Sequence, residues 1–329
     1  MRKVVFLPLH PYMWEGFEAI WSKEIATPDT QVKVIPVPTY QLGYEKSITE
    51  TTYITTGYPD NVEICGMDDY DLSAEHPDTI YIQNVLDDSD PLFSVDPHFY
   101  TKELRRFTDN LVYIPYNCIP EIDLDYTFLK RTFYSNLLTP PGIQNVDKII
   151  VHSQNAREAH LALIAGLDDN LRKKWNPKIT CEAYPRISIL DRYTKDTVSR
   201  PQSWDRHLFN SSGGRKETVL LATSIFSVLE FNRPHIKQTQ SIFEEYLKKK
   251  DSTALIWRPN EHLPESIMKL RPELFNDFRE LLEFYINNDI GIFDETPTPT
   301  PAIILSDVYI GDECGVKELF KSTGKPILQ

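Results

Sequence analysis

The residues best suited to chemistry lie near the end of the chain, where an apolar run is followed by a turn and a helix. The apolar run at residues 303–310 predicts a buried strand, which ends at the turn residues 311–315. From 316 to 320 apolar residues recur at helical spacing. A helix that begins at a glycine-containing turn has unpaired N–H groups and the positive end of its dipole, which suit phosphate. An α/β crossover without a ligand has the same spacing. The candidate donors are the backbone N–H groups of Gly311, Asp312, Cys314, Gly315 and Val316.

A second candidate, His10, stands near the start of the chain. Residues 3–9 predict a strand, and the aromatic and aliphatic residues from 14 to 25 follow at helical spacing. Residues 32–37 predict the next strand, which completes a right-handed βαβ unit. His10 follows the first strand, at the edge where open α/β sheets bind ligands. It can act there as a base or a phosphate contact, or be satisfied within its loop.

Composition excludes several classes of protein. The 329 residues carry a formal net charge of −13, which argues against a general nucleic-acid binder because such proteins need a basic surface. No apolar run approaches the roughly 18 to 20 residues of a membrane span, and Pro8 and Pro11 interrupt a signal-peptide core. The cysteines are widely spaced, which predicts reduced thiols in a cytoplasmic protein and neither a zinc site nor a disulfide framework. They are Cys65, Cys118, Cys181 and Cys314.

The periodicity divides the chain into two α/β domains. Further strands are predicted at 79–84, 111–116 and 147–152, so that 1–193 form a Rossmann-like domain. Residues 194–217 are polar and contain proline, serine and glycine, the composition of a linker. Residues 218–329 repeat the α/β pattern, with strands at 218–222, 253–257 and 290–293. We expect two parallel-sheet domains facing across a cleft. The last strand breaks off at residues 326–329, which suggests an incomplete C-terminal end.

Two details of the first domain bear on its chemistry. The acidic turn that carries Asp87, Asp88 and Asp90 can bind a divalent cation or form a helix-capping loop. Ser153 is expected to cap a helix over residues 155–164, within which we expect His160 to lie on the surface.

Several segments together resemble the bacterial CDP-glycerol glycerophosphotransferase family, the teichoic-acid and capsule phosphotransferases with a two-domain glycosyltransferase-B architecture. The resemblance extends over residues 4–329 and depends on the order of its motifs, because each alone is weak. The segments are FLPLHPYMWEGFEAIW (6–21), HPDTIYIQN (76–84), SVDPHFYTKELRRFTDNLVYIPY (94–116), IWRPNEH (256–262), IGIFDETP (290–297) and SDVYIGDECGVKELFKSTGKPILQ (306–329).

The resemblance implies transfer of a polyol phosphate from a CDP-activated donor to a hydroxyl acceptor, with no metal and no further cofactor required. Arg258 matches the arginine of the family's Arg-Pro-His-Pro segment, where a guanidinium can hold two phosphate oxygens; it can equally be a salt-bridged core residue. Asp312 matches the aspartate before the family's Ser-Ser pair. Thr323 and Lys325 match its Thr-Gly-Lys-Pro, with Lys325 a phosphate contact or a helix-end cation.

The chain departs from the family pattern at three places. Cys314 and Gly315 replace the Ser-Ser pair, which removes two hydroxyl contacts but keeps the backbone donors. Asn260 replaces the histidine of Arg-Pro-His-Pro. The catalytic His-Gly segment of the N-terminal domain has no counterpart, since residues 114–117 read Ile-Pro-Tyr-Asn. His10 or His262 can replace the missing base, whose loss costs about two to four powers of ten in rate.

Two functional classes follow. One is a transferase that moves glycerol phosphate, ribitol phosphate or a sugar from a nucleotide-activated donor to a glycan or lipid-linked acceptor in cell-wall or capsule synthesis. It would be cytoplasmic and, with a lipid-linked acceptor, peripheral at the inner membrane face. The other is a non-catalytic module of the same fold that binds a nucleotide or a glycan, or an assembly domain of a larger protein. The retained Arg258 and Asp312 favour the first class, and the missing His-Gly segment favours the second. The sequence leaves the oligomeric state open.

Overall fold

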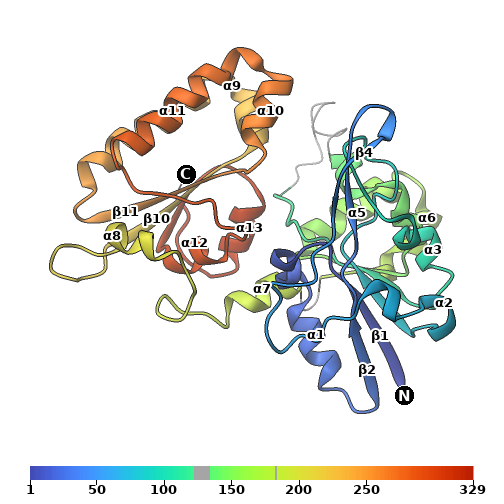
Figure 1. The fold of residues 1–329 in the computed structure, drawn as a ribbon. Helices are drawn as coiled ribbons and strands as arrows, with labels where there is room; N and C mark the ends of the chain where they lie inside the picture. Colours follow the sequence, from blue (N-terminus) through green and yellow to red (C-terminus); the bar gives the residue numbers. More distant parts are fainter. Residues whose placement is uncertain (122–133, 182–183, 329) are drawn as a thin grey trace. The chain divides into compact units, whose positions relative to one another are not determined.

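The computed structural model describes residues 1–121, 134–181 and 184–328. The chain forms two compact units, Met1–Ile189 and Leu190–Gln329, which we call the first and second units (Figure 1). Residues 194–217, predicted as a linker, belong to the second unit, where they include the short helix α8 (Asp205–Leu208).

The first unit is built on a six-stranded sheet in the order β2-β1-β5-β7-β8-β9, in which every pairing is parallel. Its central strands are short apolar runs buried on both faces, as parallel sheets require. The strands are β1 (Arg2–Leu7), β2 (Thr30–Val34), β5 (Thr79–Ile82), β7 (Leu111–Tyr113), β8 (Lys148–Ile150) and β9 (Ile179–Thr180). The predicted βαβ unit is confirmed, with α1 (Glu18–Ile25) between β1 and β2.

The remaining elements of the first unit are short helices and a small antiparallel sheet. The helices are α2 (Leu72–Glu75), α3 (Thr101–Leu104), α5 (Gln154–Ala165), α6 (Asp169–Trp175) and α7 (Pro185–Leu190). The antiparallel sheet has the order β4-β3-β6, with β3 (Thr39–Leu42), β4 (Ile48–Thr52) and β6 (Phe93–Val95). Strands β3 and β4 come from the segment between β2 and β5, and β6 follows β5 in the chain.

The position of His160 in α5 corrects a prediction. Ser153 caps this helix as expected, because its hydroxyl accepts from the Ala156 N–H. His160, however, is buried rather than on the surface, with Nδ1 2.8 Å from the carbonyl oxygen of Ala156. The helix face that carries Ala156 and Leu161 packs on the sheet, and His160 lies in that layer. Its burial lowers the pKa of the imidazole to about 4.

The second unit has a four-stranded parallel sheet in the order β12-β11-β10-β13. The strands are β10 (Glu217–Thr223), β11 (Thr253–Pro259), β12 (Ile292–Phe293) and β13 (Val308–Gly311). On one face α9 (Ile225–Lys249), α10 (Leu263–Leu270) and α11 (Phe275–Asn287) enclose a core around Trp257; α12 (Thr300–Leu305) and α13 (Gly315–Lys321) lie on the other (Figure 1). Both units are therefore Rossmann-like, as predicted.

The apolar run at 303–310 is only partly a strand. Its first part lies in α12, and β13 begins at Val308. A short apolar run does not distinguish a buried strand from a buried helix, and Pro301 in the first turn of α12 has the backbone angle that starts a helix. None of the described helices is long and apolar enough to cross a membrane.

Candidate functional site

The carboxyl edge of the second sheet brings two predicted site residues into one row. Arg258 of β11 is in register with Ala222 of β10, which is in register with Gly311 of β13. Adjacent strands lie about 4.8 Å apart, so the Cα atoms of Arg258 and Gly311 are separated by about 10 Å. Residues in register share a face of the sheet, so Arg258 and Gly311 flank Ala222 on the two sides of β10. Ligands bind at this edge in open α/β sheets.

Arg258 is held by one of its terminal nitrogens. Nη1 donates to Oδ2 of Asp294 at 2.7 Å and to Oγ1 of Thr296 at 3.2 Å. The carboxylate of Asp294 is fully buried, and only 14% of the Arg258 side chain is exposed. Nε and Nη2 form no hydrogen bond within the described part of the chain. These two nitrogens form one edge of the guanidinium, which can bind two phosphate oxygens side by side.

Gly311 occupies a position that only glycine fits. Its φ is +117°, and a Cβ added there would lie 2.4 Å from the carbonyl oxygen of Ala222. The next residue, Asp312, donates its N–H to that same oxygen at 3.1 Å. The glycine therefore allows the chain to turn sharply at the end of β13 while staying against β10.

The carboxylate of Asp312 is already engaged by the protein. Oδ2 accepts from the Ser224 N–H at 2.6 Å, at the start of α9. Nε2 of His235 lies 3.2 Å from the same oxygen, but no aligned hydrogen bond joins them. The carboxylate thus lies at the positive end of the α9 dipole, where a negative charge is stabilised.

Ser224, His235 and Asp294 are not among the site residues predicted from the sequence. Ser224 is the N-cap of α9, which its position after a strand could have indicated. His235 follows a kink in α9 at Asn232 (φ 54°) and Pro234. No local sequence pattern around His235 or Asp294 identifies the distant residue that each of them contacts.

Cys314 and the residues after it begin α13 without a hydroxyl donor. Cys314 is the N-cap of this helix, and its Sγ lies 3.5 Å from the hydroxyl of Tyr309. Burial raises the pKa of the Cys314 thiol, which therefore stays neutral at neutral pH. The residue at this helix start is thus a neutral thiol, where the resemblance expects a serine hydroxyl.

Asn260 and His262 shape the loop after β11. The Asn260 N–H donates to the carbonyl of Thr223 at 2.9 Å, and its Oδ1 accepts from the His262 N–H at 3.0 Å. The His262 side chain is 67% exposed and lies near that of Glu261. Asn260 is thus used to cap this turn, whereas His262 is accessible to solvent.

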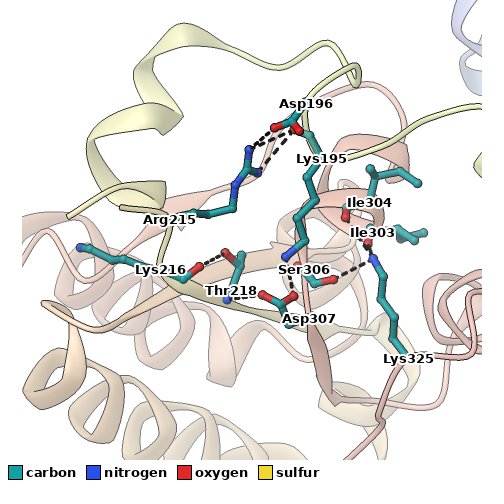
Figure 2. Close-up of polar contacts among 10 residues, drawn as sticks. All are labelled: Lys195, Asp196, Arg215, Lys216, Thr218, Ile303, Ile304, Ser306, Asp307 and Lys325. Atoms are coloured by element: carbon teal, nitrogen blue, oxygen red, sulfur yellow. Dashed lines mark hydrogen bonds and ion pairs between the residues drawn. The ribbon is translucent and has the colours of Figure 1, made fainter. Parts of the chain in front are cut away.

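Thr323 and Lys325 lie at the opposite edge of the sheet from Gly311. Nζ of Lys325 donates to three carbonyls at the end of α12 and just beyond it, those of Ile303, Ile304 and Ser306, at 2.8 to 3.0 Å (Figure 2). Burial lowers the pKa of Lys325 to about 8. Thr323 Oγ1 donates to the Phe320 carbonyl at the end of α13. Both residues are separated from the turn at Gly311 by the length of β13. A phosphate bound at that turn would therefore be out of their reach.

His10 lies at the carboxyl end of β1, in the first unit. Its Nδ1 accepts from the Tyr12 N–H at 3.3 Å and caps the short 3₁₀ helix Pro11–Gly16. Burial lowers the pKa of the His10 imidazole. The ring is therefore neutral at neutral pH, with Nδ1 used by its own loop.

The acidic turn after β5 is tied to neighbouring groups. Asp87 accepts from the N–H and hydroxyl of Thr101 at 2.8 and 2.7 Å. Asp90 accepts from the N–H groups of Leu92 and Phe93. Among the described residues no group of three or more histidine, cysteine or acidic side chains is placed to hold a metal ion.

Comparison with known proteins identifies the type of fold that the chain adopts. No family model matches the chain, and no curated protein matches its sequence. A putative UDP-N-acetylglucosamine 2-epimerase from Listeria monocytogenes is 12% identical with a TM-score of 0.54, over 99% of this chain and 78% of that one. UDP-GlcNAc 2-epimerase from Neisseria meningitidis bound to UDP-GlcNAc is 10% identical with a TM-score of 0.51, over 99% and 81%. The wall teichoic acid polymerase TagF with CDPG is 13% identical with a TM-score of 0.49, over 99% and 68%. The chain therefore has a fold of the glycosyltransferase-B type.

Proposed function

We propose that the chain is a transferase that takes a nucleotide-activated donor and moves a polyol phosphate or a sugar to a hydroxyl acceptor. The donor's diphosphate would lie at the carboxyl edge of the second sheet, against Arg258 and the turn that begins at Gly311. The acceptor would be a glycan or lipid-linked glycan of a cell-wall or capsular polymer, and CDP-glycerol and CDP-ribitol are the first donors to test.

One observation carries this proposal: Arg258 is fixed by Asp294 through Nη1, while Nε and Nη2 have no partner among the described residues. A guanidinium held in this way needs little reorganisation to bind two oxygens of a diphosphate. It also counters the negative charge that grows on the diphosphate or phosphate as the bond to it breaks. Solved structures of similar fold include an enzyme with bound UDP-GlcNAc, which supports a nucleotide donor.

A second function, a binding module without catalysis, is favoured by the way three candidate residues are engaged, two at this turn and one in the first unit. Asp312 is engaged with α9, and Cys314 supplies no hydroxyl where the resemblance expects serine. His10 has one ring nitrogen committed to its own loop. A module of this kind would bind the nucleotide and release it unchanged.

Turnover separates the two functions. Purified full-length chain is incubated with CDP-glycerol, CDP-ribitol or UDP-N-acetylglucosamine and a glycan acceptor, and the released nucleotide is measured. The proposal expects release that depends on the acceptor and that falls at least about 100-fold in Arg258→Gln. Arg200→Gln is the matched control, because Arg200 pairs with Asp205 in the same unit. Binding without turnover with any donor would select the module.

A further inference from the structure

A cavity of about 190 Å³ lies beside β12, the edge strand of the sheet in the second unit. Its polar wall comes from residues 203–207, which include the end of the 3₁₀ helix Gln202–Trp204 and the start of α8. The opposite wall comes from the end of α11 and from residues 289–293. Neither Arg258 nor Gly311 lines the cavity, so it is separate from the proposed nucleotide site.

Trp204 brings a hydrogen-bond donor without a partner to this cavity. The residue is only 5% exposed, and it lines the cavity. Its Nε1 forms no hydrogen bond within the described part of the chain, yet this atom is not enclosed, whereas Nε1 of Trp14 is. The indole N–H is a donor only, and it usually has a partner when tryptophan is buried. A group in the cavity can therefore accept a hydrogen bond from Trp204.

His207 supplies a second donor, at Nδ1. Its Nε2 accepts from Nε of Arg206 at 3.0 Å. Arginine has only donors, so Nε2 carries no proton, and the proton of the neutral ring is on Nδ1. Burial lowers the pKa of the His207 imidazole, which keeps the ring neutral at neutral pH. Nδ1 forms no hydrogen bond with any described residue and is not enclosed.

Arg206 is held by His207 at Nε and lies beside Asp289 at its other end. Nη2 is 3.1 Å from Oδ1 of Asp289, and Nη1 has no hydrogen bond among the residues that the structure describes. The Asp289 side chain is 60% exposed, so water screens its charge. Because exposed ion pairs are weak, a ligand can compete with Asp289 for this end of the guanidinium.

The hydrogen-bonding capacity of these side chains indicates the class of ligand. Trp204, His207 and Arg206 offer N–H donors, so the ligand has to present acceptors on several sides. A cation would meet the guanidinium, and a hydroxyl would find only Asp289 as an acceptor for its own proton. A carboxylate or phosphate accepts on every side, and a guanidinium can bind two of its oxygens.

The volume of the cavity limits the size of the ligand. Its roughly 190 Å³ exceeds by several-fold the volume of about 30 Å³ that one water molecule occupies. Pockets for drug-sized ligands have at least about 300 Å³, which is more than this cavity provides. A small ion therefore suits the cavity better than a nucleotide does.

We propose that Trp204, Arg206 and His207 form a site for a small oxyanion, which is a carboxylate or inorganic phosphate. The oxyanion accepts from Nε1 of Trp204, from Nδ1 of His207 and from the terminal nitrogens of Arg206. Asp289 opposes binding through its negative charge. This site goes beyond the proposed function, because a transferase and a binding module could each possess it.

NMR of the full-length chain labelled with ¹⁵N at tryptophan tests the site, because it observes the indole N–H groups directly. Acetate and phosphate are the probes, at constant ionic strength, and the Arg258→Gln background removes the contribution of the proposed nucleotide site. One of the five indole signals should shift saturably with at least one probe and be absent in Trp204→Phe. Arg206→Gln should lower the affinity about 10-fold, because it removes charged hydrogen bonds. Arg279→Gln is the matched control, since Arg279 lies near Glu283 on α11.

Asp289→Asn distinguishes an oxyanion from a ligand that donates to the carboxylate. Asparagine tolerates the φ of +48° at this position, so the turn before β12 should be retained. Without the opposing charge, an oxyanion is expected to bind about 3-fold tighter or more.

Three results would overturn the proposal. The first is the absence of a saturable shift with both probes. The second is equal affinity with and without Arg206→Gln, which would show a general effect of salt. The third is weaker binding in Asp289→Asn, which would show that the carboxylate holds the ligand. The Arg206→Gln and Asp289→Asn titrations also decide the matter if Trp204→Phe does not fold.

Discussion

Nη1 of Arg258 donates to Oδ2 of Asp294 at 2.7 Å, and this contact determines which edge of the guanidinium a ligand can reach. Asp294 is buried and its Oδ1 accepts from Thr296, so the carboxylate is fixed from both sides. The residues are 36 positions apart in sequence and meet because β11 and β12 are adjacent. The ion pair therefore positions an arginine whose Nε and Nη2 are available at the carboxyl edge of the sheet.

Replacing Arg258 with lysine tests the importance of that edge. Arg258→Lys keeps the positive charge but loses the two parallel N–H donors, so affinity for a nucleoside diphosphate is expected to fall about 10-fold or more. Titration calorimetry with CDP and UDP measures it. Arg200→Lys, at an ion pair elsewhere in the unit, should bind as the wild type does. Equal affinities of Arg258→Lys and wild type would mean that charge alone matters.

Gly311 is predicted to be irreplaceable for a steric reason. In Gly311→Ala the new Cβ would meet the Ala222 carbonyl at 2.4 Å, at a φ of +117°. We expect a loss of about 2 to 4 kcal/mol in the free energy of unfolding, measured with urea. Gly324→Ala is the control, because Gly324 also has a positive φ, +69°, but open space around it. Its cost should be only about 1 to 2 kcal/mol, and equal losses in the two variants would refute the steric argument.

Asp312 is predicted to act through structure. Asp312→Ala removes the acceptor for the Ser224 N–H and the carboxylate beside His235, so the free energy of unfolding should fall by about 1 to 3 kcal/mol. Urea unfolding and nucleotide titration are measured on the same preparation. Loss of nucleotide affinity with unchanged stability would instead identify Asp312 as a direct ligand contact.

His160 predicts a sensitivity to acid. Its pKa is about 4 in the folded chain against an ordinary value of 6.5, so the unfolded chain takes up the proton first as the pH falls. The stability associated with neutral His160 is present above pH 6.5 and is lost toward pH 4, by about 3 kcal/mol at most.

His160→Leu cannot take up this proton, so its stability should depend less on pH between 6.5 and 4 than that of the wild type. Urea unfolding at a series of pH values compares the two. Parallel pH profiles would contradict the assignment.

The sequence predicts the strands and their parallel pairing well, because short apolar runs between turn residues are a local signal. It also predicts that Arg258 and Gly311 lie at the same carboxyl edge of the sheet, because each directly follows a predicted strand. It does not predict the partners of these residues. Asp294 and His235 come close through strand order and a helix kink, and no local spacing records either.

The contacts of Lys325 depend on a helix that was not predicted from the sequence. The Thr-Gly-Lys-Pro motif suggested either a phosphate contact or a helix-end cation. Lys325 binds three carbonyls at the end of α12 and just beyond it, in a segment whose second half the sequence predicts as a strand. Once 300–305 form a helix, its C-terminal carbonyls need a donor, and Lys325 supplies it.

Binding of CDP and UDP to the second unit's carboxyl edge is the central claim, and thermal unfolding of the full-length chain tests it most directly. A nucleotide at a hundred times its dissociation constant should stabilise the wild type by about 2.7 kcal/mol and raise the midpoint of unfolding. In Arg258→Gln the same concentration should give a much smaller rise. An unchanged midpoint with every nucleotide, or an equal rise in wild type and Arg258→Gln, would contradict the account.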